Sequence, residues 1–493
     1  MIAENKKKNY WKNLLHFHDF DLIYYLYVLF CDFSTLNGAF IHIDEYFTLG
    51  FIRFPVNELI TITANDVHPP LYYVLLKIIN NSSIINDSVF TIFIFRLFSL
   101  TPYLIILIVS STLIQKKYGW LSAGIFSFSL LCMSNFSQFY ILIRMYSWAI
   151  LLMLLTFLSI IKIIENNSKK SWALLTIFSI LGAYTHYFIA ISLVVLFISL
   201  SCYFLLNKKW NELKFELLSS ALIIISYIPW AFTLFHQLTQ VHNGYWIEPL
   251  DFYDIIDCLS FYAVNLDVII YIKIFSIILL ILITIAIINK YREEQTNENV
   301  LMLLGITTFF GTLLTSIIVS IMFKPILIAR YLIIPSVVLW LTISIYIGQL
   351  KNEKILGILI ILLLFFGMIG ILNFNSYQTE LGRSSEVNQF CENLMSNVTI
   401  ICINKQPTIL FNGYFNNCDV YTTAPDLYGV KLKKVNQTVP INLILKEKIP
   451  RLIDETNGTV YIIKIKSEDI DLENYKLEDE KSISVYHFYE VLN

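Results

Sequence analysis

The sequence is poor in charged residues. Asp, Glu, Lys and Arg make up 15% of its 493 residues, whereas an ordinary soluble domain contains about 25%. Its 16 glycines and 12 prolines are few, which excludes collagen-like repeats and long low-complexity linkers. Hydrophobic residues reach 56%, so a disordered chain is excluded as well. These shortages exclude a soluble enzyme and indicate a polytopic membrane protein.

Neither sign of charge dominates. The chain has 35 Lys and Arg against 37 Asp and Glu, so it lacks the basic excess that nucleic acid requires, and we expect no nucleic-acid partner. The seven cysteines show neither CxxC spacing nor the Cys/His spacing of a zinc site. The sequence therefore encodes no local redox motif and no structural zinc site.

Apolar stretches long enough to cross a bilayer, about 17 to 25 residues each, recur along the chain. We expect about eleven spanning helices. They lie near residues 20–41, 89–114, 120–139, 147–164, 172–190, 191–207, 215–235, 268–288, 300–321, 327–348 and 355–373.

Basic residues occupy alternate loops between these stretches. A Lys-rich segment precedes the first span, and Lys or Arg pairs recur in every second loop after it. Because cytoplasmic loops are enriched in Lys and Arg, we expect a multi-pass plasma-membrane protein with a cytoplasmic N-terminus. The odd number of spans then places the C-terminus outside the cell.

The composition changes after Asn373. Residues 1–373 are expected to form the membrane domain, and the charged, mixed segment 374–493 a separate extracytoplasmic domain. A helical stretch near 384–396 precedes β-branched runs at 398–403, 420–423, 459–465 and 482–489. These patterns predict a small α/β fold. The expected fold class is thus an all-α polytopic membrane protein with a small α/β C-terminal domain.

Ionisable residues gather on the outer side of the predicted membrane domain. Asp44 and Glu45 follow the first span, His68 precedes two prolines, and His186 lies near the outer end of the fifth span. Ionisable groups near membrane depth are costly and are usually functional when they gather. Taken singly, the Asp-Glu pair is more often a solvated helix end, and each histidine is more often a packing residue.

Basic and aromatic residues lie at the same outer side. Arg144 and Tyr146 fall between the third and fourth spans, and Lys324, Arg330 and Tyr331 lie at the start of the tenth. Arginine at such depth usually pairs with a carboxylate or a phosphate, because its planar fork binds either one through two hydrogen bonds. Snorkelling to lipid headgroups is the structural alternative for each arginine alone.

In their order and spacing, these residues resemble the GT-C superfamily of membrane glycosyltransferases, specifically the dolichyl-phosphate-mannose protein mannosyltransferase-like group (glycosyltransferase family 39), which includes bacterial lipopolysaccharide sugar transferases. The resemblance covers roughly residues 20–350. The matching pieces are Asp44-Glu45, His68-Pro69-Pro70-Leu71-Tyr72-Tyr73, Arg144-Met145-Tyr146, Thr185-His186-Tyr187, Pro229-Trp230 and Arg330-Tyr331.

The resemblance implies an inverting enzyme that moves a monosaccharide from a polyprenyl-phosphate carrier to an acceptor hydroxyl at the outer membrane face. Asp44 would then be the general base, and Glu45 would stand beside it in the catalytic site. The substrate-binding residues would be His68, Arg144, Tyr146, His186, Lys324, Arg330 and Tyr331. Metal dependence stays open: Asp44, Glu45 and His68 could hold a divalent cation, but no close ligand spacing demands one. The acceptor, whether glycan, lipid or protein, and the sugar stay open.

One position departs from the pattern. Many relatives carry an acidic residue two positions before the arginine of the Arg-Met-Tyr piece, and here that position is Leu142.

Two alternatives to this function stay open. One is a flippase or transporter of lipid-linked sugars, which should have polar residues on both sides of the bilayer. The other is a catalytically inactive relative that binds glycolipid.

Overall fold

A computed structural model describes residues 43–66, 68–80, 88–133, 136–240, 247, 249–383, 398–403, 419–424, 426–427, 430–431, 441–465, 475–483 and 486–492. The described residues fall into two compact units. The first contains those of Val67–Tyr72 and Ile94–Tyr377, and the second those of Ser34–Asp66, Tyr73–Phe93 and Gln378–Asn493. The span expected at 20–41 lies outside the described residues.

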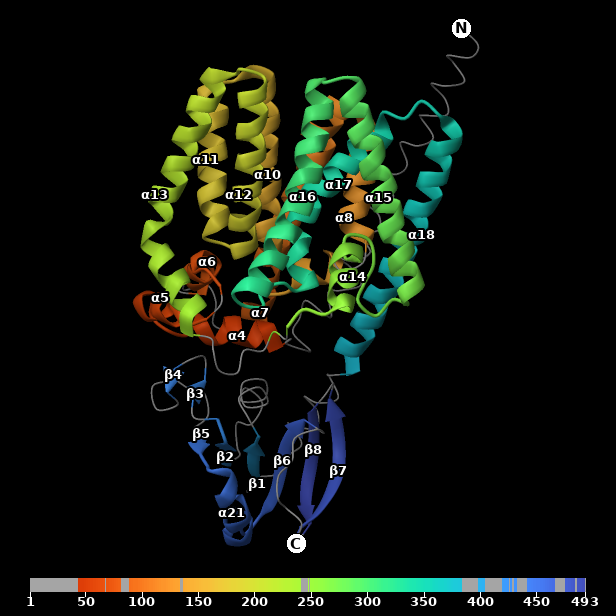
Figure 1. Cartoon of the computed structure of the whole chain (residues 1–493). Coiled ribbons are helices and arrows are strands. Elements are labelled where there is room, and N and C mark those ends of the chain that lie inside the picture. The colour runs from red at the N-terminus through yellow and green to blue at the C-terminus, as the bar shows by residue number, and fades with distance from the viewer. Residues whose placement is uncertain are drawn as a thin grey trace. The chain divides into compact units, whose positions relative to one another are not determined.

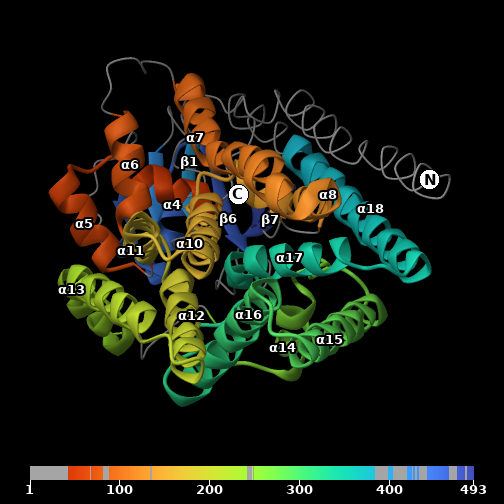
Figure 2. The same cartoon turned by 90° about the horizontal axis from the view of Figure 1, so that it is seen from above.

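Long helices build the first unit, and Figures 1 and 2 show them from the side and from the end. In chain order its helical elements are α7 (Ser88–Val109), η1 (Ser110–Ile114), α8 (Gln115–Cys132), α9 (Phe136–Ile141), α10 (Tyr146–Asn166), α11 (Lys169–Ala183), α12 (Tyr187–Leu206), α13 (Trp210–Gln240), α14 (Phe252–Ser260), α15 (Ile270–Glu293), α16 (Asn297–Met322), η2 (Ala329–Leu332), α17 (Ile333–Gly348) and α18 (Glu353–Arg383).

The helix α17 forms the centre of this unit. It packs against α8, α10, α12 and α16, and 89% of the residues in its most apolar window are buried, against 11% in α13. Gly305 on α16 allows the closest approach, because a Cβ there would overlap the hydroxyl of Thr342 on α17. Small residues at helix crossings are typical of membrane bundles, whose helices associate by close packing. The helix α13, by contrast, presents most of its apolar surface outward.

Eight helical segments in the described part of the chain are long and apolar enough to cross a membrane. This confirms the expected class of mostly helical membrane protein. One of them, Thr91–Cys132, covers two predicted spans without a loop. Gly119 divides that segment, because its φ of 87° and ψ of 168° are not helical. Glycine tolerates such a left-handed φ without steric cost.

The predicted boundary between the spans 172–190 and 191–207 is wrong. The helix α11 ends at Ala183 and α12 begins at Tyr187. The break falls on Tyr184-Thr185-His186, a short polar interruption that lies within the first of the two predicted spans. The break is made by His186, whose extended backbone and side-chain nitrogen cap the first turn of α12.

The second unit contains two short helices near its start and a mixed sheet near its end. The helices α4 (Ile43–Phe51) and α5 (Val56–Ala64) pack against each other, and α6 (Leu71–Asn80) begins directly after the His68-Pro69-Pro70 segment, as expected from the prolines. The remaining elements are β1 (Val398–Cys402), β2 (Asp419–Thr422), β3 (Asp426–Leu427), β4 (Val430–Lys431), β5 (Ile441–Leu443), η4 (Lys446–Lys448), α21 (Ile449–Glu455), β6 (Thr459–Ile465), β7 (Lys476–Ile483) and β8 (Tyr486–Leu492).

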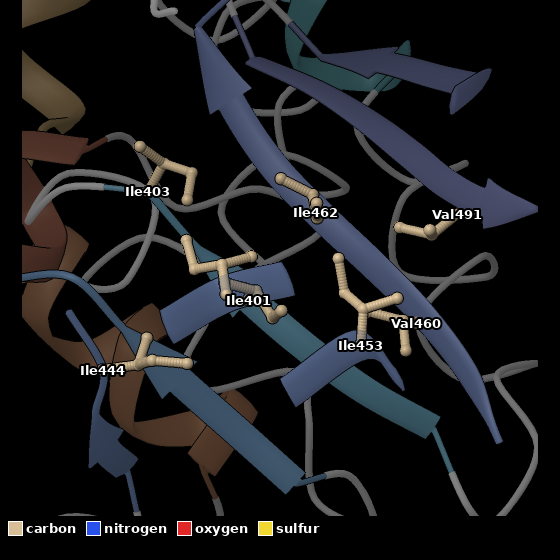
Figure 3. Close-up of a cluster of buried hydrophobic side chains, with 8 residues drawn as sticks. Ile401, Ile403, Ile444, Ile453, Val460, Ile462 and Val491 are labelled. Atoms are coloured by element: carbon tan, nitrogen blue, oxygen red, sulfur yellow. The ribbon is translucent and has the colours of Figure 1, made fainter. Parts of the chain in front are cut away.

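The six strands of the main sheet run in the order β5-β2-β1-β6-β8-β7. The first four are parallel, and β8 and β7 are antiparallel. Ile449 and Ile453 of α21 belong to one buried hydrophobic cluster with Ile401 and Ile462 of the central strands. Figure 3 shows Ile453 beside these strands. This buried cluster gives the expected small α/β fold its core.

Most expected strands of the C-terminal region are present. The runs at 398–403, 420–423 and 459–465 correspond to β1, β2 and β6. The run at 482–489 is wrong as a single strand, because it contains the end of β7 and the start of β8, which pair as a hairpin. The helix expected near 384–396 lies outside the described residues.

Candidate functional site

A cavity of about 240 Å³ lies in the first unit, where α12 begins and the chain passes from α16 to η2. Its polar lining residues are His68, His186, Tyr187, Gln237, Lys324 and Tyr331. Four of these were expected to bind substrate from the sequence alone. Residues from four separate stretches of the chain therefore meet around one small space.

His186 lies at the centre of this group. Its side chain is 2% exposed, and its Nδ1 accepts a hydrogen bond of 3.1 Å from the backbone N–H of Phe188. A neutral imidazole carries its proton on the nitrogen that does not accept. The proton of His186 therefore lies on Nε2, which has no hydrogen-bond partner among the described residues. This atom is a buried donor at the edge of the cavity.

His68 is held beside His186 by the backbone. The N–H of Leu71 donates to the carbonyl oxygen of Tyr184 at 3.1 Å, which ties the Pro-Pro segment to the end of α11. The rings of His68 and His186 then lie 5.7 Å apart between centroids, nearly edge to face. The two prolines fix the backbone that carries His68. Local sequence thus positions this histidine rigidly.

The segment between α16 and η2 brings Lys324, Arg330 and Tyr331 to the same place. The Ser320 hydroxyl accepts hydrogen bonds of 3.1 Å from two successive backbone N–H groups, those of Ile326 and Leu327, and so fixes the return of the chain. The Tyr331 ring lies 5.0 Å from that of His186. The Arg330 guanidinium lies 5.7 Å from the Tyr331 ring.

Arg144 and Tyr146 approach from the turn between α9 and α10. Arg144 is 5% exposed, and the ring of Tyr146 lies 5.7 Å from that of His186. Leu142, where many relatives carry an acid, is also buried. All seven residues predicted to bind substrate thus belong to one group around His186.

Several basic residues surround His186. Burial, and then repulsion from His68 and Arg144, lower the pKa of His186 well below its usual 6.5, and Arg330 acts in the same direction. His186 is therefore neutral near pH 7. Burial lowers the pKa of Lys324 from 10.5 to about 8, so this lysine still carries its charge at neutral pH. Two arginines and a lysine around a neutral histidine form a site suited to an anion.

A chain of hydrogen bonds runs along the wall of the cavity that Tyr187 and Gln237 line. The sequence did not indicate these bonds. Trp230 Nε1 donates to the Tyr187 hydroxyl at 3.0 Å, and this hydroxyl donates to Gln237 Oε1 at 2.5 Å. Tyr187 and Trp230 both belong to matching motifs, and Gln237 is a polar residue near the end of an apolar segment, but none of these signals indicates that the three are bonded. The contact itself depends on how α12 and α13 pack, which no local pattern predicts.

Asp44 and Glu45 lie in the second unit, in the first turn of α4. Asp44 is half-buried, and Glu45 is 1% exposed. Acidic residues in this position interact favourably with the N-terminal end of the helix dipole. In the part of the chain that the structure describes, no three His, Cys, Asp or Glu side chains come together as a metal-binding group.

No family model matches the sequence, and no curated protein matches it. Among solved structures, the chain is similar to the crystal structure of ArnT from Cupriavidus metallidurans bound to undecaprenyl phosphate. The TM-score is 0.57 at 9% sequence identity, over 95% of this chain and 97% of that one. The apo state of ArnT matches with a TM-score of 0.43 at 11% identity and the same coverage.

ArnT is a membrane glycosyltransferase of the GT-C type. The match to its lipid-bound structure extends over nearly the whole of both chains, and the apolar helices make this chain a membrane protein. The expected resemblance is confirmed at the level of the fold alone: this chain is folded like ArnT.

Proposed function

We propose that the protein is an inverting glycosyltransferase that moves a monosaccharide from a polyprenyl-phosphate carrier to an acceptor hydroxyl at the outer membrane face. The observation that carries this proposal is the group of Arg144, Arg330 and Lys324 around the buried His186. That group occurs in a GT-C fold whose solved relative binds undecaprenyl phosphate. A lipid-linked sugar phosphate is the anion that best fits both facts.

The positive group supports a binding role toward the carrier phosphate. Arginine guanidinium groups bind phosphate oxygens through two hydrogen bonds, and lysine binds them as a point charge. When the bond between the sugar and the phosphate breaks, negative charge grows on the phosphate oxygens. Fixed cations in a water-poor site stabilise that charge without having to reorganise. In this mechanism Arg144, Arg330 and Lys324 lower the barrier by holding the leaving group.

His186 acts as a neutral donor in the same mechanism. Its Nδ1 accepts a hydrogen bond from the backbone, and its Nε2 is buried without a partner among the described residues. The Nε2–H is therefore the group that donates to the ligand. A hydrogen bond to an ionised group contributes about 1.5–3 kcal/mol. Tyr146 and Tyr331 flank the ring of His186 and limit its rotation. The protonation state needed for this role is the one that burial favours.

Asp44 is the proposed general base, and Glu45 stands beside it in the catalytic site. This assignment rests on the sequence resemblance of the Asp-Glu pair that follows the first predicted span. A carboxylate can accept the proton of the acceptor hydroxyl as that oxygen attacks the sugar. The phosphate leaves with little need for a general acid. The proposal places the reaction outside the cell, with the N-terminus in the cytoplasm and the domain of residues 374–493 on the extracytoplasmic side.

The experiment uses purified full-length protein, a panel of radiolabelled polyprenyl-phosphate monosaccharides, and native membrane lipids and proteins as acceptors. Wild type should transfer label from one donor. Asp44→Asn should abolish transfer while it leaves carrier binding intact, because the substitution removes the base with almost no change in volume. A fully active Asp44→Asn protein would exclude Asp44 as the base. Carrier binding without transfer by wild type would instead favour a transporter or an inactive relative.

A further inference from the structure

A second, larger cavity lies on the first unit, in the groove between α12 and α13. Its volume is about 530 Å³, and its walls are almost entirely apolar. It shares Ala190 with the candidate site and continues along α12 as far as Cys202. Cys202 comes twelve residues after Ala190 on the helix, which corresponds to a groove about 18 Å long. Such dimensions fit a hydrocarbon chain lying along the helices.

One acidic side chain lines this apolar groove. Glu216 on α13 is 1% exposed, and its Oε1 accepts a hydrogen bond of 3.1 Å from the Ser220 hydroxyl. Ser201 lies beside this carboxyl group and also lines the groove. The other oxygen, Oε2, has no partner among the described residues. Burying an ionised carboxyl group with one open oxygen is costly, and a cation bound to that oxygen offsets the cost.

The depth of Glu216 in the membrane indicates where that cation comes from. The helix α13 has 31 residues and is therefore about 46 Å long, close to the full thickness of a bilayer with its headgroups. Glu216 lies six residues after Trp210, the first residue of the helix, which is about 9 Å along its axis. This level corresponds to the boundary between headgroups and hydrocarbon. Lipid headgroups, rather than the bilayer centre, are within reach of the carboxylate.

We propose that the groove between α12 and α13 binds a membrane lipid with a primary ammonium headgroup, of the phosphatidylethanolamine type. The ammonium donates hydrogen bonds to Glu216 Oε2, and one acyl chain lies along the apolar walls toward Ala190. Three features select this ligand: the apolar lining, the open carboxylate oxygen and the depth of Glu216. The site is separate from the proposed phosphate site and does not depend on the proposed function.

The test compares two lysolipids that differ only in their headgroups. Lysophosphatidylethanolamine has a primary ammonium that donates hydrogen bonds, whereas lysophosphatidylcholine with the same acyl chain has a trimethylated nitrogen that cannot. Binding to the purified full-length protein in detergent is followed by the shift in melting temperature as each lipid is titrated. Wild type should bind the ethanolamine lipid about tenfold more tightly, because a hydrogen bond to a charged group is lost with choline.

Glu216→Gln should remove this preference. Glu212→Gln is the matched control, because Glu212 lies one turn earlier on α13 and does not line the groove; it should keep the preference. Equal binding of the two lipids by wild type, or an undiminished preference in Glu216→Gln, would overturn the proposal. If Glu216→Gln does not fold, the comparison of the two lipids on wild type and Glu212→Gln still decides it. Absence of binding by either lipid would also refute the site.

Discussion

The charge of Lys324 should make carrier binding depend on pH. Burial lowers the pKa of this lysine to about 8, so about nine-tenths of the molecules carry the charge at pH 7 and about one-tenth at pH 9. A bound phosphate favours the protonated form. Above pH 8 the free protein has lost this proton, and binding must restore it. The affinity for the carrier should therefore fall as the pH rises through 8.

The size of the effect follows from the same linkage. If one charge-assisted hydrogen bond raises the pKa of Lys324 by somewhat more than one unit in the complex, the affinity falls about fivefold to tenfold between pH 7 and 9. The carrier phosphate does not contribute, because its second pKa is about 6 and its charge is constant in this range. His186 does not contribute either, because its lowered pKa keeps it neutral throughout.

The assay is a titration of purified protein with undecaprenyl phosphate at half-unit steps from pH 7 to 9.5. Lys324→Arg is the control, since a guanidinium stays charged above pH 12 and binding should then be independent of pH. Lys324→Met should bind weakly and also without pH dependence. If wild type binds equally well at pH 7 and 9, or if Lys324→Met keeps the wild-type slope, Lys324 does not contact the carrier phosphate.

Two further substitutions test the packing that supports the site and the sheet. Tyr187→Phe removes the acceptor of the buried Trp230 N–H and the donor to Gln237, so the free energy of unfolding should fall by about 1–3 kcal/mol. The control is Tyr271→Phe at an exposed position, which should leave the melting temperature unchanged. An equal loss of stability in both variants would contradict the hydrogen-bonded chain. Ile462→Ala leaves a cavity in the buried cluster beside α21 and should destabilise the sheet by about 2–5 kcal/mol. Hydrogen exchange of the amides in the strands measures this loss. A loss below about 1 kcal/mol would show that the cluster is not the core of the sheet.

Hydropathy alone predicted most of the helices of the first unit. The helices α10, α15 and α16 coincide closely with apolar runs bounded by charged residues, because a spanning helix must satisfy its backbone internally and face lipid. The break before α12 could not be predicted in this way. It depends on the capping nitrogen of His186, and a polar interruption as short as Thr185-His186 does not by itself indicate the end of a helix.

The C-terminal strands were harder to delimit. Parallel strands such as β1 are buried on both faces and appear as continuous β-branched runs, which are easily recognised. The hairpin of β7 and β8 has charged residues along β7, from Glu478 to Lys481. Its first strand therefore does not resemble a buried strand. The strand β7 forms because it pairs with β8, and the periodicity of the sequence does not reveal that pairing.

The seven residues proposed to bind substrate were selected from the order of the motifs, and in the structure the other six lie in one unit with His186. The wall formed by Tyr187, Trp230 and Gln237 was not assigned, although Pro229-Trp230 is part of the resemblance. Its residues lie on two helices, and their hydrogen bonds arise from the packing of those helices. Motif order can therefore indicate which residues share a site, but not which of them hold one another in place.

The central claim is that the positive group in the first unit holds the phosphate of a sugar-carrying lipid while the sugar is transferred. The most direct measurement incubates purified protein with a radiolabelled polyprenyl-phosphate monosaccharide and a membrane extract, and follows labelled product and free polyprenyl phosphate together. Wild type should produce both in equal amounts, and Arg330→Ala should produce neither at the same donor concentration. Equal amounts of both products from Arg330→Ala and wild type would contradict the account.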